Sequence, residues 1–170
     1  MPLINTSRLQ LEPFTLDDAA FILMLVNEPG FHRYIGDRGV RTLEDARGYL
    51  RERVIPSYER HGFGLWRVAL KRDGQPIGMC GLLQRPFLDV PDIGYAVLET
   101  MHGQGYAVEA ASATLAYARD NLGLGRIKAI VAPDNERSIH LLAKVGFVLD
   151  STLTWPDSAE TVNLYARSLE

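Results

Sequence analysis

The segment from Asp92 to Tyr117 constrains the fold of this chain more than any other. A β-rich run, Asp92–Leu98, precedes His102-Gly103-Gln104-Gly105, and an amphipathic helix follows these glycines. Its apolar residues recur at alternating spacings of three and four, at Val108, Ala111, Leu115, Ala118 and Leu122. Glycines before a helix allow a ligand to approach the free N–H groups of the first turn closely. This order predicts a phosphate or pyrophosphate site, and the alternative is an ordinary tight strand–helix turn.

Two common phosphate-binding motifs are absent. The sequence has no Gly-x-x-x-x-Gly-Lys-Ser/Thr, which argues against a P-loop NTPase. Gly103-x-Gly105 is followed by Val108 where a dinucleotide-binding fingerprint has a small residue. The turn therefore fits neither of these two nucleotide-binding classes.

The remaining patterns predict a mixed sheet covered by helices. Strands are expected at 8–13, 65–71, 76–84, 126–132, 147–153 and 161–166, with a hairpin turn at Asp73-Gly74. Variant capping boxes at Thr15-Leu-Asp-Asp and Thr42-Leu-Glu-Asp predict helices over about 17–27 and from residue 43. Pro29-Gly30 should end the first helix, and Pro56 should disrupt or end the second. Another helix is expected at 135–145, stopped by Gly146.

Composition limits the class of protein further. The 170 residues correspond to about one domain, and a net charge of −3 argues against nucleic acid as the main partner. Cys80, the only cysteine, fits a buried thiol and a cytosolic compartment. No signal peptide or membrane span is expected, since the longest apolar run is 19–26. No His, Cys and Asp cluster has metal-ligand spacing, so no metal is predicted.

Two motifs carry a resemblance to a known family. His102-Gly103-Gln104-Gly105-Tyr106-Ala107 is followed downstream by Asn135-Glu136-Arg137-Ser138 and by Gly146-Phe147. The first resembles the acyl-CoA motif of the GNAT acetyltransferase superfamily, and the second resembles that family's Asn-x-x-Ser helix. The run Gly105–Ala110 looks like the RimJ/RimL-like branch, which acetylates the N-termini of ribosomal proteins. The resemblance covers nearly the whole chain.

The resemblance implies a fold and a cosubstrate. It implies one α/β domain over residues 1–170, with a seven-stranded mixed sheet, four main helices and two parallel strands split by the arm of acetyl-CoA. The pyrophosphate would rest on the turn amides of Gly103, Gln104, Gly105, Tyr106 and Ala107. The pantetheine arm would pair with Ala96, Val97 and Leu98, and Asn135 would contact it or its surroundings. His102 stands where the family usually has Gln or Arg.

Candidate catalytic residues follow from the chemistry of acetyl transfer to an amine, which requires a base, an oxyanion donor and stabilisation of the thiolate. Asp92 is the first candidate for the base, and a solvent-exposed strand-edge Asp is the alternative. The backbone N–H near Val97 is the candidate oxyanion donor. Ser138 is a possible proton donor to the thiolate, although its hydroxyl could instead bind backbone at the helix start. Many family members carry a tyrosine acid where this chain has Leu142.

The acceptor side is expected in the segment Phe31–Arg38, where His32 and Tyr34 are candidate substrate contacts. Trp66 and Tyr95 are expected in the core, and Glu109 is expected to have a structural role. The function implied is acetyl-CoA-dependent N-acetylation of a primary amine, with a protein N-terminal α-amine as the first choice. The alternatives are a small-molecule amine, or a non-catalytic acyl-CoA-binding module. A monomer or a homodimer is expected.

Overall fold

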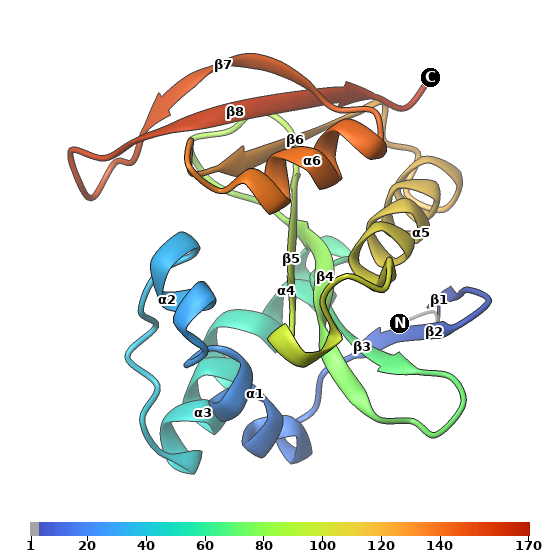
Figure 1. Ribbon diagram of the computed structural model, residues 1–170, viewed down its shortest axis with the longest axis vertical. Helices are drawn as coiled ribbons and strands as arrows, with labels where there is room; N and C mark the ends of the chain where they lie inside the picture. Colours follow the sequence, from blue (N-terminus) through green and yellow to red (C-terminus); the bar gives the residue numbers. More distant parts are fainter. Residues whose placement is uncertain (1–3) are drawn as a thin grey trace.

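Eight strands form one mixed sheet in the computed structural model, which describes residues 4–170 (Figure 1). The strand order is β1-β2-β3-β4-β5-β6-β8-β7. The strands are β1 (Ile4–Asn5), β2 (Leu9–Pro13), β3 (Leu65–Leu70), β4 (Pro76–Leu83), β5 (Asp92–Val97), β6 (Arg126–Val131), β7 (Val148–Thr154) and β8 (Thr161–Ser168). The expected mixed α/β class is confirmed, but the expected number of seven strands is wrong. The strand that was missed, β1, has only two residues and therefore shows no alternation in the sequence.

The β3–β4 hairpin confirms the turn expected at Asp73-Gly74. Gly74 has a φ of +76°, which is readily available to glycine, and its N–H donates to the carbonyl of Leu70. Leu65 pairs with Gly81 at the far end of the hairpin. The glycine turn thus sets the register of the two central antiparallel strands.

Helices cover both faces of the sheet (Figure 1). One face is covered by α5 (Tyr106–Asp120) and α6 (Glu136–Lys144). The other is covered by α1 (Ala19–Leu25), α2 (Pro29–Tyr34) and α3 (Leu43–Tyr49), with α4 (Ile55–His61) after them. Alternation along β4 divides the side chains, so that Cys80 joins the first core and Met79 joins the second.

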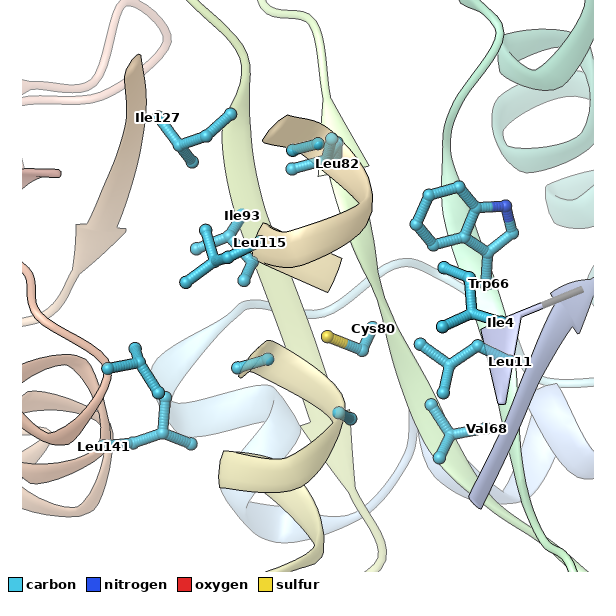
Figure 2. Packing of buried hydrophobic residues seen from close by; sticks show 14 of the residues in the cluster. Ile4, Leu11, Trp66, Val68, Cys80, Leu82, Ile93, Leu115, Ile127 and Leu141 are labelled. Carbon is cyan, nitrogen blue, oxygen red and sulfur yellow. The ribbon is translucent and has the colours of Figure 1, made fainter. Parts of the chain in front are cut away.

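The core beneath α5 depends on small residues. Ala110, Ala111 and Ala118 are buried, so the helix can lie close to the sheet, and Leu115 fills the space beside Ile93 (Figure 2). Cys80 lies in this core with its Sγ 3.3 Å from the Thr114 hydroxyl, and burial raises the pKa of the thiol to about 12. The expected inert core thiol is therefore confirmed.

The first helix, α1, ends at Leu25, before Pro29 as expected, but Pro29 and Pro56 also lie at the starts of further helices. Pro29 begins the short helix α2, because a proline in the first turn loses no hydrogen bond. Pro56 likewise lies in the first turn of α4, and a π-helical turn at Leu50–Val54 joins α3 to α4. Residues 43–61 therefore form one continuous helical run. The capping boxes at Thr15 and Thr42 are both present.

The sheet opens between β5 and β6, which are the one parallel pair among the strands of residues 4–170. These strands share a single paired position, Asp92 with Lys128, whereas β4 and β5 pair over six positions. In Figure 1, β4 and β5 run vertically, while β6, β7 and β8 cross the top of the view. From Ile93 to Val97, the edge of β5 that faces β6, called its inner edge below, pairs with no strand of residues 4–170.

Candidate active site

A cavity of about 1450 Å³ occupies the opening between β5 and β6. Its walls come from the inner edge of β5, the glycine turn, the first turns of α5 and α6, and the segment around α2. It brings together most of the residues selected from the sequence, namely His32, Tyr34, Asp92, Ala96, Val97, His102, Gly103, Gly105, Tyr106, Ala107, Asn135 and Ser138. Leu98 and Gln104 are not among its lining residues.

The glycine turn has the conformation that its sequence predicts. Gly103 and Gly105 have φ values of +79° and +80°, and Gly105 is the N-cap of α5. No side chain caps this N-terminus, so the N–H groups of the first turn remain available at the positive end of the helix dipole. An anion such as pyrophosphate would find both donors and a favourable field here.

Arg8 and Glu109 hold the turn from outside the cavity. The Arg8 guanidinium donates to the Gln104 carbonyl at 2.9 Å and to Glu109 at 2.7 Å, and it lies over the ring of Tyr106. Glu109 also accepts from the Arg8 backbone N–H at 3.0 Å. The structural role expected for Glu109 is confirmed, because its carboxylate ties α5 to the start of β2.

The end of β5 presents backbone groups to the cavity. The Leu98 N–H donates to Ile77 in β4, so the alternation of a strand directs the Val97 N–H to the opposite edge, toward the opening. His102 Nε2 lies 2.8 Å from the Val97 carbonyl oxygen. His102 therefore fixes the strand end to the glycine turn, and the amide of Leu98 is already used within the sheet.

Asp92 is buried, not exposed at a strand edge as the alternative interpretation had it. Only 1% of its surface is exposed, and both carboxylate oxygens accept from Arg85 Nε, at 3.0 and 3.2 Å. Burial raises the pKa of the Asp92 carboxyl to about 6, although the Arg85 guanidinium acts in the opposite direction. A carboxyl with such a pKa is ionised at neutral pH and can accept a proton.

Asn135 and Ser138 share the start of α6. The Asn135 side chain caps the helix by accepting from the Ser138 N–H at 3.3 Å. The Ser138 hydroxyl does not bind backbone, which was the alternative considered for it. It is hydrogen-bonded to the hydroxyl of Tyr95, on β5.

His32 and Tyr34 lie on α2, across the cavity from α6. Arg33, between them on α2, forms an ion pair of 3.4 Å with Asp134, which comes just before α6. This ion pair brings α2 and the start of α6 together at the cavity. The His32 ring nitrogen lies 3.1 Å from the Asn27 side-chain oxygen. Both candidate substrate contacts therefore line the cavity from α2.

The chain matches the model of the acetyltransferase (GNAT) domain over residues 8–148. It belongs to the GNAT family. The N-acetyltransferase YoaA of Bacillus subtilis is 31% identical over 154 residues, which cover 89% of this chain and 86% of YoaA. This GNAT protein is thus an N-acetyltransferase, as the sequence predicted.

Solved structures agree with that fold. An acetyltransferase from Agrobacterium tumefaciens superposes with a TM-score of 0.83 and 26% identity, covering 98% of this chain and 94% of its own. RimL, a ribosomal L7/L12 α-N-protein acetyltransferase solved with coenzyme A, gives 0.85 at 19% identity and 98% coverage of both chains. A chimera of the spermidine N-acetyltransferase SpeG from Vibrio cholerae and hSSAT gives a TM-score of 0.78 at 18% identity and 96% coverage of both chains. At these lower identities the likeness shows the fold alone.

The residues present fit acetyl-CoA. Gly103 has no side chain that could keep a ligand away from its backbone. The space beside it is open, because no atom lies within 4 Å of the position that a Cβ would take. The uncapped N-terminus of α5 suits the pyrophosphate, and the free inner edge of β5 suits the amides of the pantetheine arm. The resemblance to the RimJ/RimL-like branch remains a resemblance.

Several lining residues were missed by sequence reasoning. Tyr95 packs against the core as expected, but its hydroxyl also reaches the cavity wall, which was not predicted. Arg85 comes from the loop before β5, and its guanidinium stacks on Trp155, which follows β7. No local pattern signals either contact, because the partners lie 43 and 70 positions apart. Trp66 was correctly expected in the core.

Residues 4–170 contain neither a cluster of metal-ligating side chains nor a helix that could span a membrane. In this part of the chain no group of three or more His, Cys, Asp or Glu side chains could hold a metal ion. Within the same range, none of the helices combines the length and the apolar character that crossing a membrane requires.

Proposed function

We propose that this GNAT protein transfers the acetyl group of acetyl-CoA directly to a protein N-terminal α-amine. The observation that carries the proposal is the continuity of the cavity. One space joins the glycine turn, the Asp92 carboxylate and the segment that holds His32 and Tyr34. Cosubstrate and amine can therefore meet without a covalent enzyme intermediate. Residues 1–170 are taken as one domain, of which 1–3 lie outside the described residues.

The chemistry assigned to each residue follows from its position. Acetyl-CoA supplies an activated acyl carbon, and the chain's own residues bind it, orient it and manage the protons. Asp92 is assigned the proton that the amine loses, directly or through water, because an alkylammonium with a pKa of roughly 10 must be deprotonated to attack. The Val97 N–H is assigned to the carbonyl oxygen of the thioester, where negative charge develops. Ser138 is assigned to the departing sulfur.

Two arginines that line the cavity without a carboxylate partner favour a peptide over a polyamine as the acceptor. Arg38 and Arg53 line the cavity, and among residues 4–170 neither has a carboxylate oxygen within 4.0 Å. Five carboxylates also line the cavity. Asp92 is paired with Arg85, and Glu28 and Glu99 accept from the backbone N–H groups of Glu99 and Gly30. The other two are Glu136, in the first turn of α6, and Glu160, just before β8. Free guanidinium groups repel a polycation such as spermidine and tolerate a peptide that carries carboxylates.

A non-catalytic acyl-CoA-binding module is the competing function. It would keep the glycine turn and Asn135 but would transfer nothing. The buried carboxylate of Asp92 favours an enzyme, because a carboxyl with a raised pKa inside a cleft is typical of an acid–base group. A cytosolic location remains a prediction from the single buried cysteine.

The test is release of the CoA thiol in the presence of a panel of amines. The panel contains matched peptides with a free or blocked α-amine, a blocked peptide with a free lysine, and spermidine, and products are identified by mass spectrometry. Acetylation of the free α-amine alone is the expected result. Preference for spermidine would overturn the choice of acceptor. Binding of CoA with no transfer to any amine would favour the non-catalytic module.

A further inference from the structure

Two hydroxyl groups meet across the opening of the sheet. The hydroxyl of Tyr95, on β5, is hydrogen-bonded to Oγ of Ser138, in the first turn of α6. Both residues line the cavity. Among residues 4–170, theirs is the one hydrogen bond between side chains that joins β5 to α6, and it therefore links two walls of the cavity.

Either hydroxyl can donate in this hydrogen bond, and the Tyr95 hydroxyl also lies 3.5 Å from the Ser138 carbonyl oxygen. Asn135 already caps α6, so the Ser138 hydroxyl is not needed for the helix. A phenol has one proton to donate, and a serine hydroxyl can accept one hydrogen bond while it donates its own proton elsewhere. When Tyr95 donates to Ser138 Oγ, the Ser138 proton is left to point into the cavity.

The α6 position at which many family members carry a tyrosine supplies no hydroxyl donor in this chain. Leu142, at the position where many family members carry a tyrosine, is fully buried and does not line the cavity. Burial raises the pKa of the Tyr95 phenol well above its ordinary value, so Tyr95 keeps its proton at neutral pH. The Tyr95 hydroxyl can therefore donate a hydrogen bond throughout the neutral pH range.

We propose that Tyr95 is a positioning residue for acetyl transfer, which orients the Ser138 hydroxyl so that it donates to the sulfur of CoA. The inference rests on the proposed function. The amine nitrogen forms a bond to the acyl carbon, the C–S bond breaks with its electron pair on sulfur, and the amine proton passes to Asp92, directly or through water. CoA leaves as a thiolate that accepts a hydrogen bond from Ser138 and then takes up one proton from solvent, to which Asp92 returns one. Tyr95 and Ser138 hold the same protons before and after, because they act by hydrogen bonding alone.

The test uses the thiol of bound CoA, which requires no acceptor amine. A hydrogen bond to a thiolate lowers the pKa of the thiol. Tyr95→Phe should therefore raise the pKa of the bound thiol by about 0.5 to 1, measured from the pH dependence of its alkylation by iodoacetamide with CoA saturated by protein. Cys80, the only cysteine of the chain, is buried and adds little background. Tyr117→Phe is the matched control, since Tyr117 packs on Trp66 outside the cavity.

Ser138→Ala separates positioning from a structural role. It should raise the pKa of the bound thiol at least as much as Tyr95→Phe, and the double variant should add nothing to it. With an amine acceptor, Tyr95→Phe should lower kcat about 3- to 10-fold and leave the KM for acetyl-CoA within 2-fold. Additive effects of the two variants would overturn the proposal.

Other outcomes are equally decisive. An unchanged titration in Ser138→Ala would overturn the inference even if Tyr95→Phe failed to fold. Failure of the wild-type protein to bind CoA would overturn the inference together with the proposed function. A shifted titration in a protein that acetylates no amine would leave the hydroxyl pair in place and reject only the transfer reaction.

Discussion

Arg85 Nε lies 3.0 and 3.2 Å from the two carboxylate oxygens of Asp92, and the Arg85 guanidinium stacks 5.3 Å from the ring of Trp155. One cation thus joins the start of β5 to the turn between β7 and β8. It balances the charge of a carboxylate that would otherwise be buried alone, which is costly. Burial still dominates, so the pKa of Asp92 is raised to about 6.

Asp92→Asn tests the assignment of the base. The amide has nearly the same shape but cannot accept a proton at neutral pH, so kcat should fall roughly 10²- to 10⁴-fold while the affinity for CoA changes little. For the wild type, kcat should fall as pH decreases through about 6, and the variant should lose this limb. Partial recovery at high pH is expected, because more of the amine is then deprotonated. Activity within a few-fold of wild type would remove Asp92 from the mechanism.

Arg85→Met tests the electrostatic coupling of this pair. Removal of the guanidinium takes away the charge that lowers the pKa of Asp92, so that pKa should rise further. The acidic limb of the pH profile of kcat should then move to higher pH. Arg119→Met is the control, since Arg119 pairs with Asp120 on the exposed side of α5. A limb that stays in place would show that Asp92 does not control the profile.

Local signals in the sequence predicted most elements correctly. The capping boxes at Thr15 and Thr42, the turn at Gly74 and the stop at Gly146 all depend on neighbours within a few residues, and all are present. The helical run through Pro56 was missed because a π-turn accommodates that proline, and no residue pattern announces such a turn.

The site was harder to predict than the fold. The glycine turn at 103–105 could be recognised, because its conformation depends on the glycines themselves. The partners of Asp92 and Ser138 could not, since Arg85 and Tyr95 reach them only through tertiary packing. An Asp at a strand start and a Tyr within a strand have the same local appearance whether they lie on the surface, in the core or in a cleft.

Gly105→Val should abolish tight binding of CoA in a protein that still folds. Gly105 has a φ of +80°, where a side chain costs about 1–2 kcal/mol, and its Cβ would lie 3.4 Å from the flexible Arg8 side chain. Gly123→Val is the matched control, because Gly123 has a φ of +66° with open space around it and does not line the cavity. Both variants should lose similar stability in thermal unfolding, but only Gly105→Val should weaken CoA at least 10-fold by calorimetry. Equal affinities in the two variants would make the turn purely structural.

Acetyl-CoA should raise the melting temperature of the protein. A ligand that binds only the folded state at 100 times its Kd adds about 2.7 kcal/mol, which for a chain of this size corresponds to roughly 5–10 °C. ATP and NAD should give much smaller shifts, since neither carries a pantetheine arm to pair with the free edge of β5. A shift with ATP as large as that with acetyl-CoA would indicate a general nucleotide site.

Leu142→Tyr should destabilise the protein without supplying an acid. Although many family members have a tyrosine at this position of α6, the Leu142 side chain is fully buried in the core and does not reach the cavity. A larger side chain with a hydroxyl must displace its neighbours or lose its hydrogen bonds to water, at a cost of about 1–3 kcal/mol. Urea unfolding measures this loss, and Leu142→Met, which conserves volume, should cost less than about 1.5 kcal/mol. The kcat of Ser138→Ala should stay low when Leu142→Tyr is added. Recovery of kcat in that double variant would mean that a phenol at position 142 can reach the sulfur, and that α6 adopts a different packing when the substrate is bound.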